Sequence, residues 1–375
     1  MKFSDIPGLE NEKKRLIDSF KCNKLHHAIL FFGQRGSANL SIAIAFATYI
    51  NCENKFDSDS CGKCSSCSKM KKLIHPDFNL IFPVAATTKI NKEVVSDKFV
   101  ESWRMSFKEN PYMNVDDWFI FYGFENKQPN ISKDEARNII RKLSLKPYES
   151  KFKIILLWLP EYLHISTSNA LLKILEEPPG ETLFFIISND YHKLLKTILS
   201  RVQMFKVPKF TDDEIKIYLS KYDQISESEV NRAIYLSEGD LNHAMKHINS
   251  QQSDDLNRLI EWMRSCYLEN YLDINNHTEW FNSLNKISKR TFMMYSLKLM
   301  REAMVSSIDS SLSRISENES SFIDKFKMTL EPKSLEKIIL LIDQNIRLLD
   351  RNANPKILFL NLSIELSNHF KKVKA

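Results

Sequence analysis

The sequence predicts an α/β fold with a buried parallel sheet, followed by a C-terminal region that is all helical. Two short, continuous apolar runs, residues 28–33 and 153–157, are typical of strands covered on both faces. Residues 183–189 form a third run of this kind, and residues 40–50 have the pattern of an amphipathic helix. From Leu256 onward the apolar residues recur at helical spacing. A chain of 375 residues can form two or three domains with packed cores.

The first predicted strand leads into a loop at the position of a Walker A phosphate loop, between a strand and a helix. A working loop reads G-x-x-x-x-G-K-[ST], in which the lysine contacts the phosphates and the hydroxyl holds magnesium. Gly33 and Gly36 are present, but Ala38 stands in place of the second required glycine. Asn39 replaces the lysine and Leu40 replaces the metal ligand. We expect no functional ATP/Mg²⁺ site here, and the loop alone is also compatible with an ordinary strand-to-helix turn.

A second nucleotide motif has changed in the same way. In a Walker B motif the strand at residues 153–157 would be followed by carboxylates that hold magnesium and polarise the attacking water. Trp158 and Leu159 occupy those positions. Glu161 lies two residues past the position of the base, and we assign it no catalytic role. The two altered motifs together predict a chain that does not hydrolyse ATP.

Characteristic strings occur in order along about the first 245 residues. They are Ile6–Leu9 with Leu25–Ala28, His75–Asp77, Ile131–Arg137, Asn169–Pro179, the strand at 183–189, and Thr197–Arg201. Together they resemble the clamp-loader branch of the AAA+ family, whose patterns include N-A-L-L-K-x-L-E-E-P-P, a sensor-1 strand and T-I-x-S-R-C. The resemblance implies a RecA-like AAA+ parallel-sheet domain with an inserted zinc module, a small helical lid and an all-α collar.

The resemblance and the composition together give three predicted domains. They are residues 1–208, a RecA-like domain with a zinc module at about 50–70, residues 209–250, a lid, and residues 251–375, a collar for oligomerisation. Thr211, followed by three acidic residues, predicts the first helix of the lid, and the polar residues 249–255 predict a hinge. The expected collar core includes Trp262, Phe281, Leu284, Phe292, Leu297 and Met300, with a further apolar helix over 338–349. An independent helical bundle is the alternative for this region.

Within that family the chain resembles the subunit type that keeps the zinc module and an arginine finger but usually does not hydrolyse ATP. The replacements in both nucleotide motifs agree with this type. So does Asn242, which stands in the sensor-2 segment where the ATPase members place an arginine. The other subunits of such a ring, the ATP-hydrolysing ones and the clamp-opening one, are the implied partners, with the sliding clamp and primed DNA reached through the complex.

Arg201 is the residue that the resemblance implies to be catalytic, as an arginine finger acting in trans. A guanidinium is planar and permanently charged, so it can stabilise charge on the γ-phosphate of a neighbouring subunit. Val202 replaces the family cysteine that follows, a packing change that leaves the arginine in place. A surface arginine at a helix end is the simpler interpretation of this residue alone.

Four cysteines within sixteen residues predict a metal site. The spacing Cys52-x8-Cys61-x2-Cys64-x2-Cys67 supplies the four thiolates that a tetrahedral Zn²⁺ requires, and four protein ligands make a structural site. An iron–sulfur cluster is the main alternative. Disulfides are less expected, since we find no signal peptide and the other two cysteines, Cys22 and Cys266, are isolated. The lysine-rich segment cannot bury much of a core, so metal should supply its folding free energy.

The composition restricts the partners without identifying one. The net charge of +6 and a pI near 8.8 permit contact with phosphate backbones but do not require it. No apolar run approaches the ~20 residues of a membrane span, and we expect a cytoplasmic location. Residues 80–130 exceed what a minimal family member needs, and we expect a surface insertion whose aromatic residues, such as those at 118–124, serve as core or interface anchors.

Two other functions stay open from the sequence. One is an active clamp-loader ATPase with an unusual loop, which would require Asn39 and Leu40 to perform work that neutral side chains cannot do. The other is a zinc-dependent nucleic-acid-binding protein on a decayed ATPase scaffold, which would bind DNA by itself with a steep dependence on salt.

Overall fold

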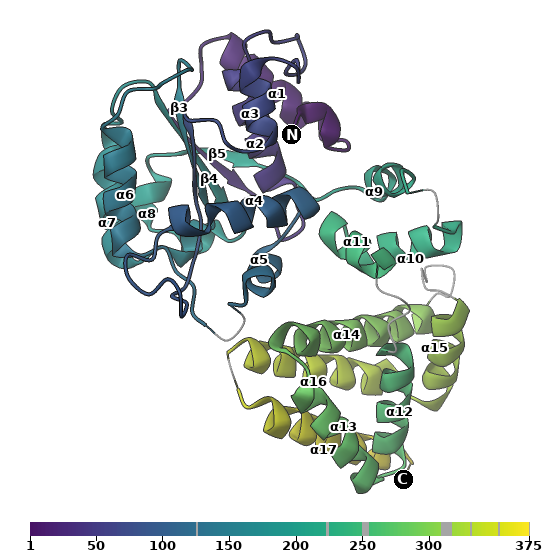
Figure 1. The fold of residues 1–375 in the computed structure, drawn as a ribbon. Coiled ribbons are helices and arrows are strands. Elements are labelled where there is room, and N and C mark those ends of the chain that lie inside the picture. The colour runs from purple at the N-terminus through teal and green to yellow at the C-terminus, as the bar shows by residue number, and fades with distance from the viewer. Residues whose placement is uncertain are drawn as a thin grey trace. The chain divides into compact units, whose positions relative to one another are not determined.

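The computed structural model describes residues 1–124, 127–222, 225–249, 255–308, 317–330, 332–351 and 353–374. The chain forms two compact units (Figure 1). The first comprises residues 1–225 and 236–247, and the second residues 226–235 and 248–375. The sheet belongs to the first unit, and the described elements of the second are all helices.

The sheet has five parallel strands in the order β2-β3-β4-β1-β5. They are β1 (Ala28–Phe32), β2 (Phe78–Ile81), β3 (Lys153–Trp158), β4 (Thr182–Ser188) and β5 (Gln203–Lys206). Ala28 of β1 lies opposite Phe184 of β4, and Ile29 lies opposite Gln203 of β5. The predicted buried parallel sheet is thereby confirmed. Because the strands are parallel, their carboxyl ends meet at one edge, which is where such sheets bind ligands.

Helices cover both faces of the sheet (Figure 1). On one face α6 (Lys133–Leu143), α7 (Ile165–Glu176) and α8 (Lys196–Leu199) share a core with alternate strand residues, among them Leu30, Ile155 and Ile186. On the other face lies α2 (Asn39–Asn51), with α1 (Glu10–Lys21) beside it. There the ring of Phe46 stacks on that of Phe185 with 5.5 Å between centroids. The strand side chains alternate between the two cores, as the pleat requires.

The described residues of the segment 80–130, namely 80–124 and 127–130, form a folded insertion with its own aromatic core. It contains the 3-10 turn η2 (Ser96–Phe99) and the helices α4 (Val100–Glu109) and α5 (Val115–Tyr122). Phe82 stacks on Trp103 with centroids 5.4 Å apart and meets Trp118 edge to face at 5.3 Å. Trp103, Trp118 and Phe124 are fully buried. The prediction that aromatic residues of the 118–124 segment anchor a core is confirmed for Trp118 and Phe124.

Three helices follow the last strand. They are α9 (Asp212–Leu219), α10 (Glu227–Ser237) and α11 (Leu241–Asn249). The predicted start of α9 is confirmed by a capping box, in which the hydroxyl of Thr211 accepts from the backbone N–H of Glu214 at 3.3 Å and the Glu214 carboxylate accepts from the N–H of Thr211 at 2.8 Å. Helix α9 and residues 236–247 of the α10–α11 region belong to the same unit as the sheet. The three-domain division stays a prediction, and most of the predicted hinge, residues 250–254, lies outside the described residues.

The second unit is a bundle of long helices. They are α12 (Asp255–Tyr267), α13 (Tyr271–Ser283), α14 (Lys286–Ile308), α15 (Glu317–Thr329), α16 (Pro332–Asp350) and α17 (Pro355–Lys374). The indole of Trp262 stacks on Phe359 at 4.6 Å and donates to the hydroxyl of Ser363 at 2.8 Å. The predicted core positions are buried, except for Leu284, which is half-buried. The predicted apolar helix at 338–349 lies within α16.

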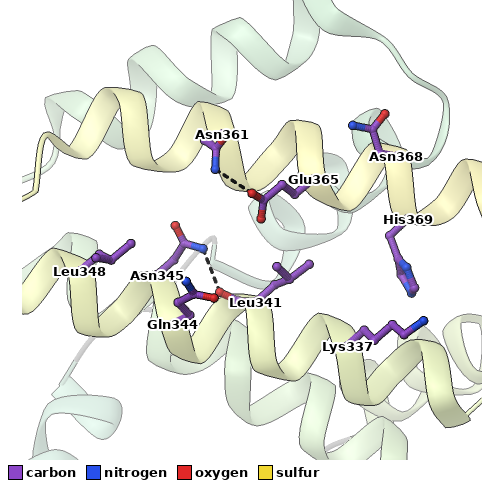
Figure 2. Close-up of a pocket in the computed structure, with 9 residues that line it drawn as sticks. All are labelled: Lys337, Leu341, Gln344, Asn345, Leu348, Asn361, Glu365, Asn368 and His369. Carbon is purple, nitrogen blue, oxygen red and sulfur yellow. Dashed lines mark hydrogen bonds between the residues drawn. The ribbon is translucent and has the colours of Figure 1, made fainter.

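A groove of about 540 Å³ lies between α16 and α17 (Figure 2). Its lining is mostly polar, and two of its amides are bonded within their own helices. Asn345 donates to the carbonyl of Leu341 at 2.8 Å, and Asn361 donates to the carboxylate of Glu365 at 2.9 Å. This groove therefore gives no indication of a particular ligand. None of the helices in the described part of the chain has both the length and the apolar character that a membrane crossing requires.

Candidate functional site

The strand–loop–helix unit predicted for the phosphate loop is present at the carboxyl end of β1. The loop runs from Gly33 to Ala38, and α2 begins at Asn39. Both glycines are needed for close backbone approach. A Cβ on Gly33 would lie 2.5 Å from the carbonyl oxygen of Val207, and Gly36 has a φ of +85°, which favours glycine. The glycines at positions 33 and 36 are therefore required by the conformation and packing of this loop.

Asn39 fills the lysine position with a buried, neutral side chain. Its amide nitrogen donates to the carbonyl of Ser188 at 3.2 Å and to the side-chain oxygen of Asn189 at 3.0 Å. Its own side-chain oxygen accepts from the backbone N–H of Leu40 at 2.9 Å. Both donors and the acceptor of this amide are thus used in linking the start of α2 to the end of β4. Leu40, at the position of the magnesium ligand, is also buried.

The Walker B position is filled by packed apolar groups. Trp158, the last residue of β3, is buried and meets the ring of Trp103 edge to face at 5.8 Å. Leu159 follows in the left-handed region with a φ of 62° and is also buried. The insertion thereby seals the end of β3, because Trp103 belongs to its helix α4. Neither an indole nor an alkyl side chain offers an oxygen to a metal ion, so neither Trp158 nor Leu159 can serve as a magnesium ligand.

Glu161 has a structural role that sequence reasoning did not find. One oxygen of its carboxylate accepts from the hydroxyl of Ser188 and from the backbone N–H groups of Asn189 and Asp190, each at 2.7 Å. The carboxylate therefore caps the end of β4, where the sensor-1 residue of this fold is expected. Its partners lie 27 to 29 residues further along the chain. No local pattern could have indicated them.

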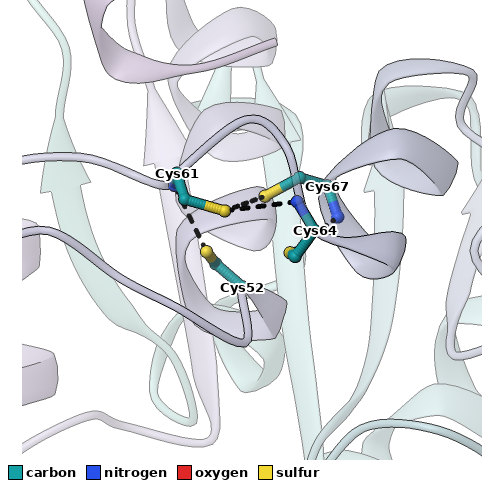
Figure 3. A group of neighbouring side chains, drawn as sticks. All are labelled: Cys52, Cys61, Cys64 and Cys67. Atoms are coloured by element: carbon teal, nitrogen blue, oxygen red, sulfur yellow. Dashed lines mark hydrogen bonds between the residues drawn. The ribbon is translucent and has the colours of Figure 1, made fainter.

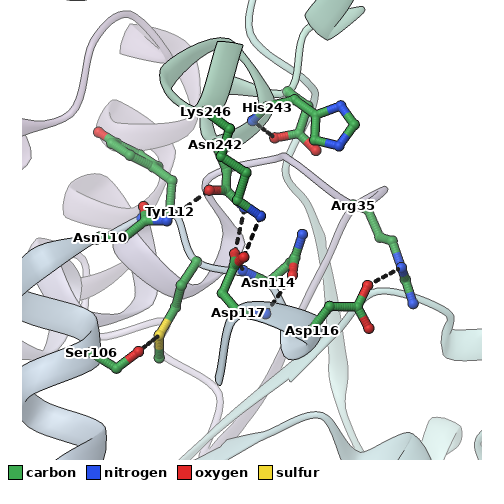
Figure 4. A network of polar contacts seen from close by, with 12 residues as sticks. Arg35, Ser106, Asn110, Tyr112, Asn114, Asp116, Asp117, Asn242, His243 and Lys246 are labelled. Atoms are coloured by element: carbon green, nitrogen blue, oxygen red, sulfur yellow. Dashed lines mark hydrogen bonds and ion pairs between the residues drawn. The ribbon is translucent and has the colours of Figure 1, made fainter. Parts of the chain in front are cut away.

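Asn242, at the predicted sensor-2 position, is fully buried and faces the insertion (Figure 4). Its amide nitrogen donates to the carboxylate of Asp117 at 2.6 Å, and its oxygen accepts from the side chain of Asn110 at 2.7 Å. The structure thus brings the loop after β1, the end of β4 and the start of α11 close to one another. Residues 110–117 also lie there, and no pattern in their sequence indicates this position.

Arg201 lies just after α8, on the surface of the first unit, with 29% of its side chain exposed. Its guanidinium is paired with the carboxylate of Glu176 at the end of α7, with 2.9 Å between Nε and Oε1. It also donates to the carbonyl of Thr197 at 2.7 Å. The guanidinium of Arg201 is therefore oriented by Glu176 and Thr197 of the same chain. Its role in a neighbouring subunit stays a prediction.

The four predicted metal ligands come together in one cluster (Figure 3). The sulfur atoms of Cys52, Cys61, Cys64 and Cys67 all lie within 4.8 Å of one another. Cys52 ends α2, and Cys64 begins α3 (Ser65–Lys71) as its N-cap, with its sulfur accepting from the backbone N–H of Cys67 at 3.4 Å. The sequence spacing thus closes a ring of sulfur atoms of the size that a tetrahedral ion needs.

The chemistry of this cluster suits a metal ion. Backbone N–H groups of Lys63 and Cys64 donate to the sulfur of Cys61, each at 3.4 Å, and lower the pKa of that thiol to about 6. Burial raises the pKa of Cys52 and of Cys67. Thiolates of this number and spacing fit Zn²⁺ in a closed site. Of the two remaining cysteines, Cys22 is exposed and Cys266 is buried.

Asp77, in the predicted segment after the cysteines, fixes the entry to β3. Its carboxylate accepts from the backbone N–H groups of Tyr148, Glu149 and Ser150 at 2.6 to 2.9 Å. Burial alone would raise the pKa of this carboxyl, but the three amide donors outweigh burial and lower it. The segment therefore links the cysteine cluster to the central sheet.

The five-stranded parallel sheet, the phosphate loop after β1 and the lid helices define a RecA-like AAA+ module. Residues 8–211 match the family described as DNA polymerase III, delta subunit. The match covers more than half of the chain, and the chain belongs to this family. The resemblance to bacterial clamp-loader AAA+ subunits is thereby confirmed.

Relatives within this group carry several names. DNA polymerase III subunit gamma of Buchnera aphidicola subsp. Schizaphis graminum is 27% identical over 80% of this chain and 68% of its own length. Subunit delta' of Escherichia coli is 24% identical over 62% of this chain and 58% of its own. Subunit tau/gamma of Haemophilus influenzae is 28% identical over 58% of this chain, which spans about a quarter of that longer protein. The identities are too similar to separate one subunit type from another.

Proposed function

We propose that this chain is the delta-prime subunit of a bacterial DNA polymerase III clamp loader, a subunit that does not itself hydrolyse ATP. In this role it assembles with the tau/gamma ATPase subunits and the delta subunit in a cytoplasmic hetero-oligomeric ring. Through that complex it helps to load the sliding clamp onto primed DNA, as part of a DNA-directed DNA polymerase holoenzyme. The helices of the second unit serve as the collar that joins it to its neighbours.

The observation that supports this proposal most directly is the presence of Asn39, a neutral and fully hydrogen-bonded residue, at the position of the lysine. A lysine at this position would present a charged amine to the β- and γ-phosphates, whereas Asn39 has its amide bonded to Ser188 and Asn189. Trp158, buried against Trp103, supports the same conclusion at the second motif. Asn39 in place of the lysine, and Trp158 and Leu159 in place of the carboxylates, cannot supply the charges that stabilise a reacting triphosphate in working members of this class.

Arg201 gives such a subunit its contribution to catalysis. It acts in trans, as an arginine finger for the ATP bound by the next subunit, and Glu176 positions its guanidinium on the surface. The four cysteines bind one structural Zn²⁺, which stabilises a segment too small for a core of its own.

The main alternative is an active tau/gamma-type ATPase, because relatives with those names are as similar as the delta' relative. The purified chain separates the two. It should bind Mg²⁺–ATP weakly or not at all and show no turnover above background, while the tau/gamma subunit of the same organism serves as the positive control. ATP turnover by the chain alone, lost on Arg35→Ala or Asn39→Ala, would overturn the proposal.

The second alternative is a zinc-dependent nucleic-acid-binding protein. It is tested by DNA binding of the isolated chain as a function of salt, since several phosphate contacts would give a steep slope. Reconstitution with purified tau/gamma and delta subunits tests the proposal itself. We expect a stable complex whose DNA-dependent ATPase activity and clamp loading require this chain.

A further inference from the structure

The insertion lies across the phosphate loop. Residues 110–117 connect α4 to the first turn of α5, and they contact both the loop and the helix that follows it (Figure 4). The carbonyl of Pro111 accepts from the hydroxyl of Ser41, in the first turn of α2, at 2.6 Å. The carboxylate of Asp116 accepts from the guanidinium of Arg35, within the loop, at 3.0 Å. The insertion therefore supplies a negative charge to the loop.

The same segment binds the lid helix α11. The carboxylate of Asp117 pairs with the ammonium group of Lys246 and accepts from the amide of Asn242 at 2.6 Å. It also accepts from the backbone N–H of Asn114 at 2.8 Å, which completes a capping box on α5. Only 12% of the Asp117 side chain is exposed. A charged carboxylate can be buried to this extent because these three donors replace the hydrogen bonds that it would make with water.

An aromatic cluster joins the insertion to α9 as well. Tyr112 is buried, and its ring meets those of Phe210 and Tyr218 edge to face, each with 5.6 Å between centroids. Phe210 lies just before α9, and Tyr218 belongs to α9. The base of the lid is also bonded to the N-terminal segment, where the carboxylate of Glu214 accepts from the N–H of Leu9 at 3.0 Å. Apolar burial and polar contacts thus act on the same part of the lid.

We propose that residues 110–117 are a built-in substitute for nucleotide, which links the phosphate loop to the lid when nothing is bound. In an ATP-binding protein of this class the phosphates lie between the loop and a positively charged residue of the lid, and their charge holds the two together. Here Asp116 pairs with Arg35 of the loop, and Asp117 pairs with Lys246 and Asn242 of α11. The two carboxylates occupy adjacent positions and perform the linking function of the phosphates.

The consequence is a lid whose position does not depend on ATP or ADP. Asn242 is bonded on both sides by the insertion, through Asn110 and Asp117, and so is not available to a phosphate. This explains why a chain can lose its nucleotide chemistry and keep the lid in a defined place.

Hydrogen exchange of the full chain tests the proposal. The variants Asn242→Ala and Lys246→Met remove lid partners of Asp117 without altering the capping box of α5. We expect exchange of the α11 amides to rise by about five- to thirtyfold in Asn242→Ala, the factor that corresponds to losing one buried polar contact. The rise should be smaller in Lys246→Met, because 45% of the Lys246 side chain is exposed. Asp117→Asn should have a similar effect. Combined with Asn242→Ala it should add little, because the two residues are coupled.

The matched control is Asp134→Asn. It removes a carboxylate from the first turn of α6, where Asp134 pairs with Arg137 on an exposed surface, and it should leave α11 unchanged. In the unmodified chain, millimolar Mg²⁺–ATP or ADP should leave exchange of α5 and α11 unchanged. Unaltered α11 exchange in the lid-side variants would overturn the proposal. So would nucleotide that releases the insertion or adds protection to α11 in the unmodified chain.

Discussion

Gly36 and Asp240 approach each other so closely that a Cβ on the glycine would lie 2.2 Å from the carboxyl carbon of the aspartate. Asp240 also caps α11, since its carboxylate accepts from the backbone N–H of His243 at 3.0 Å. The phosphate loop and the start of the lid helix are therefore in direct contact. The contact requires a glycine both for space and for its φ of +85°.

Gly36→Ala is expected to destabilise this contact. The new methyl group would meet both the side chain and the backbone of Asp240, so the loop or the start of α11 must move. We expect a loss of about 1 to 3 kcal/mol in the free energy of unfolding, with faster hydrogen exchange in α11. Chemical denaturation of the full chain measures the first quantity.

Gly123→Ala is the matched control for that substitution. Gly123 has a φ of +76° at the end of α5, but nothing lies within 4 Å of its added Cβ. It should cost only the backbone strain of about 1 kcal/mol and leave α11 protected. Equal effects of the two substitutions on α11 would contradict the direct contact of loop and lid.

The parts of the site that the sequence predicts are those with local signatures. The loop is read from residues that are nearly consecutive, and the cysteine cluster from a spacing within sixteen residues. The strands follow from short apolar runs because a parallel sheet buries both faces. In each case the residues that determine the local structure lie close together in the sequence.

The contacts that the sequence does not reveal join distant segments. Asn242 and Asp117 are 125 residues apart, and Arg201 and Glu176 are 25 apart. Asp117 in the sequence is one of two acidic residues in the first turn of a helix, which is an ordinary N-terminal signal. Only the packing of the insertion against the lid gives it a second function.

The pairing of Glu176 with Arg201 predicts graded effects on a reconstituted clamp loader. Arg201→Ala should lower ATP turnover at the one site that receives this arginine by about 10³-fold or more, with assembly unchanged. Glu176→Ala leaves the guanidinium present but poorly oriented, and we expect a smaller loss at that site, roughly ten- to hundredfold. Steady-state ATPase assays and size-exclusion chromatography measure the two properties.

The control for both variants is Arg137→Ala, which removes an exposed arginine of α6 that pairs with Asp134. It should change neither turnover nor assembly. Full turnover by an assembled complex that carries Arg201→Ala would exclude the arginine finger. A Glu176→Ala complex as active as the unmodified one would show that this carboxylate does not position it.

The cysteine cluster predicts one zinc ion per chain. Cys64→Ser removes a thiolate ligand while leaving a hydroxyl that can still cap α3, so the protein should lose the metal and residues 50–70 should exchange faster. Elemental analysis of the purified chain gives the metal content. Cys22→Ser, which changes an exposed cysteine outside the cluster, should retain a full equivalent of zinc. A carefully purified chain with iron in place of zinc, or with no metal, would contradict the assignment.

Asp77 predicts a pH dependence of stability. Hydrogen bonds from three backbone amides outweigh the effect of burial and lower the pKa of this carboxyl in the folded chain. A carboxyl with a depressed folded pKa stabilises the protein above its unfolded pKa, about 3.9, and this contribution is lost as the pH falls through the folded pKa. Asp77→Asn should therefore cost about 1 to 3 kcal/mol at neutral pH, where the charge is present.

The size of that cost should change with pH in one direction only. Below about pH 4 the carboxyl becomes protonated first in the unfolded chain and only at lower pH in the folded chain, so the stability difference between the two proteins should shrink, as followed by urea denaturation at several pH values. Asp134→Asn, on the exposed surface of α6, should show no such dependence. A difference for Asp77→Asn that is constant from pH 7 to pH 3 would mean that shape and hydrogen bonding alone, and not the charge of the carboxylate, hold the entry to β3.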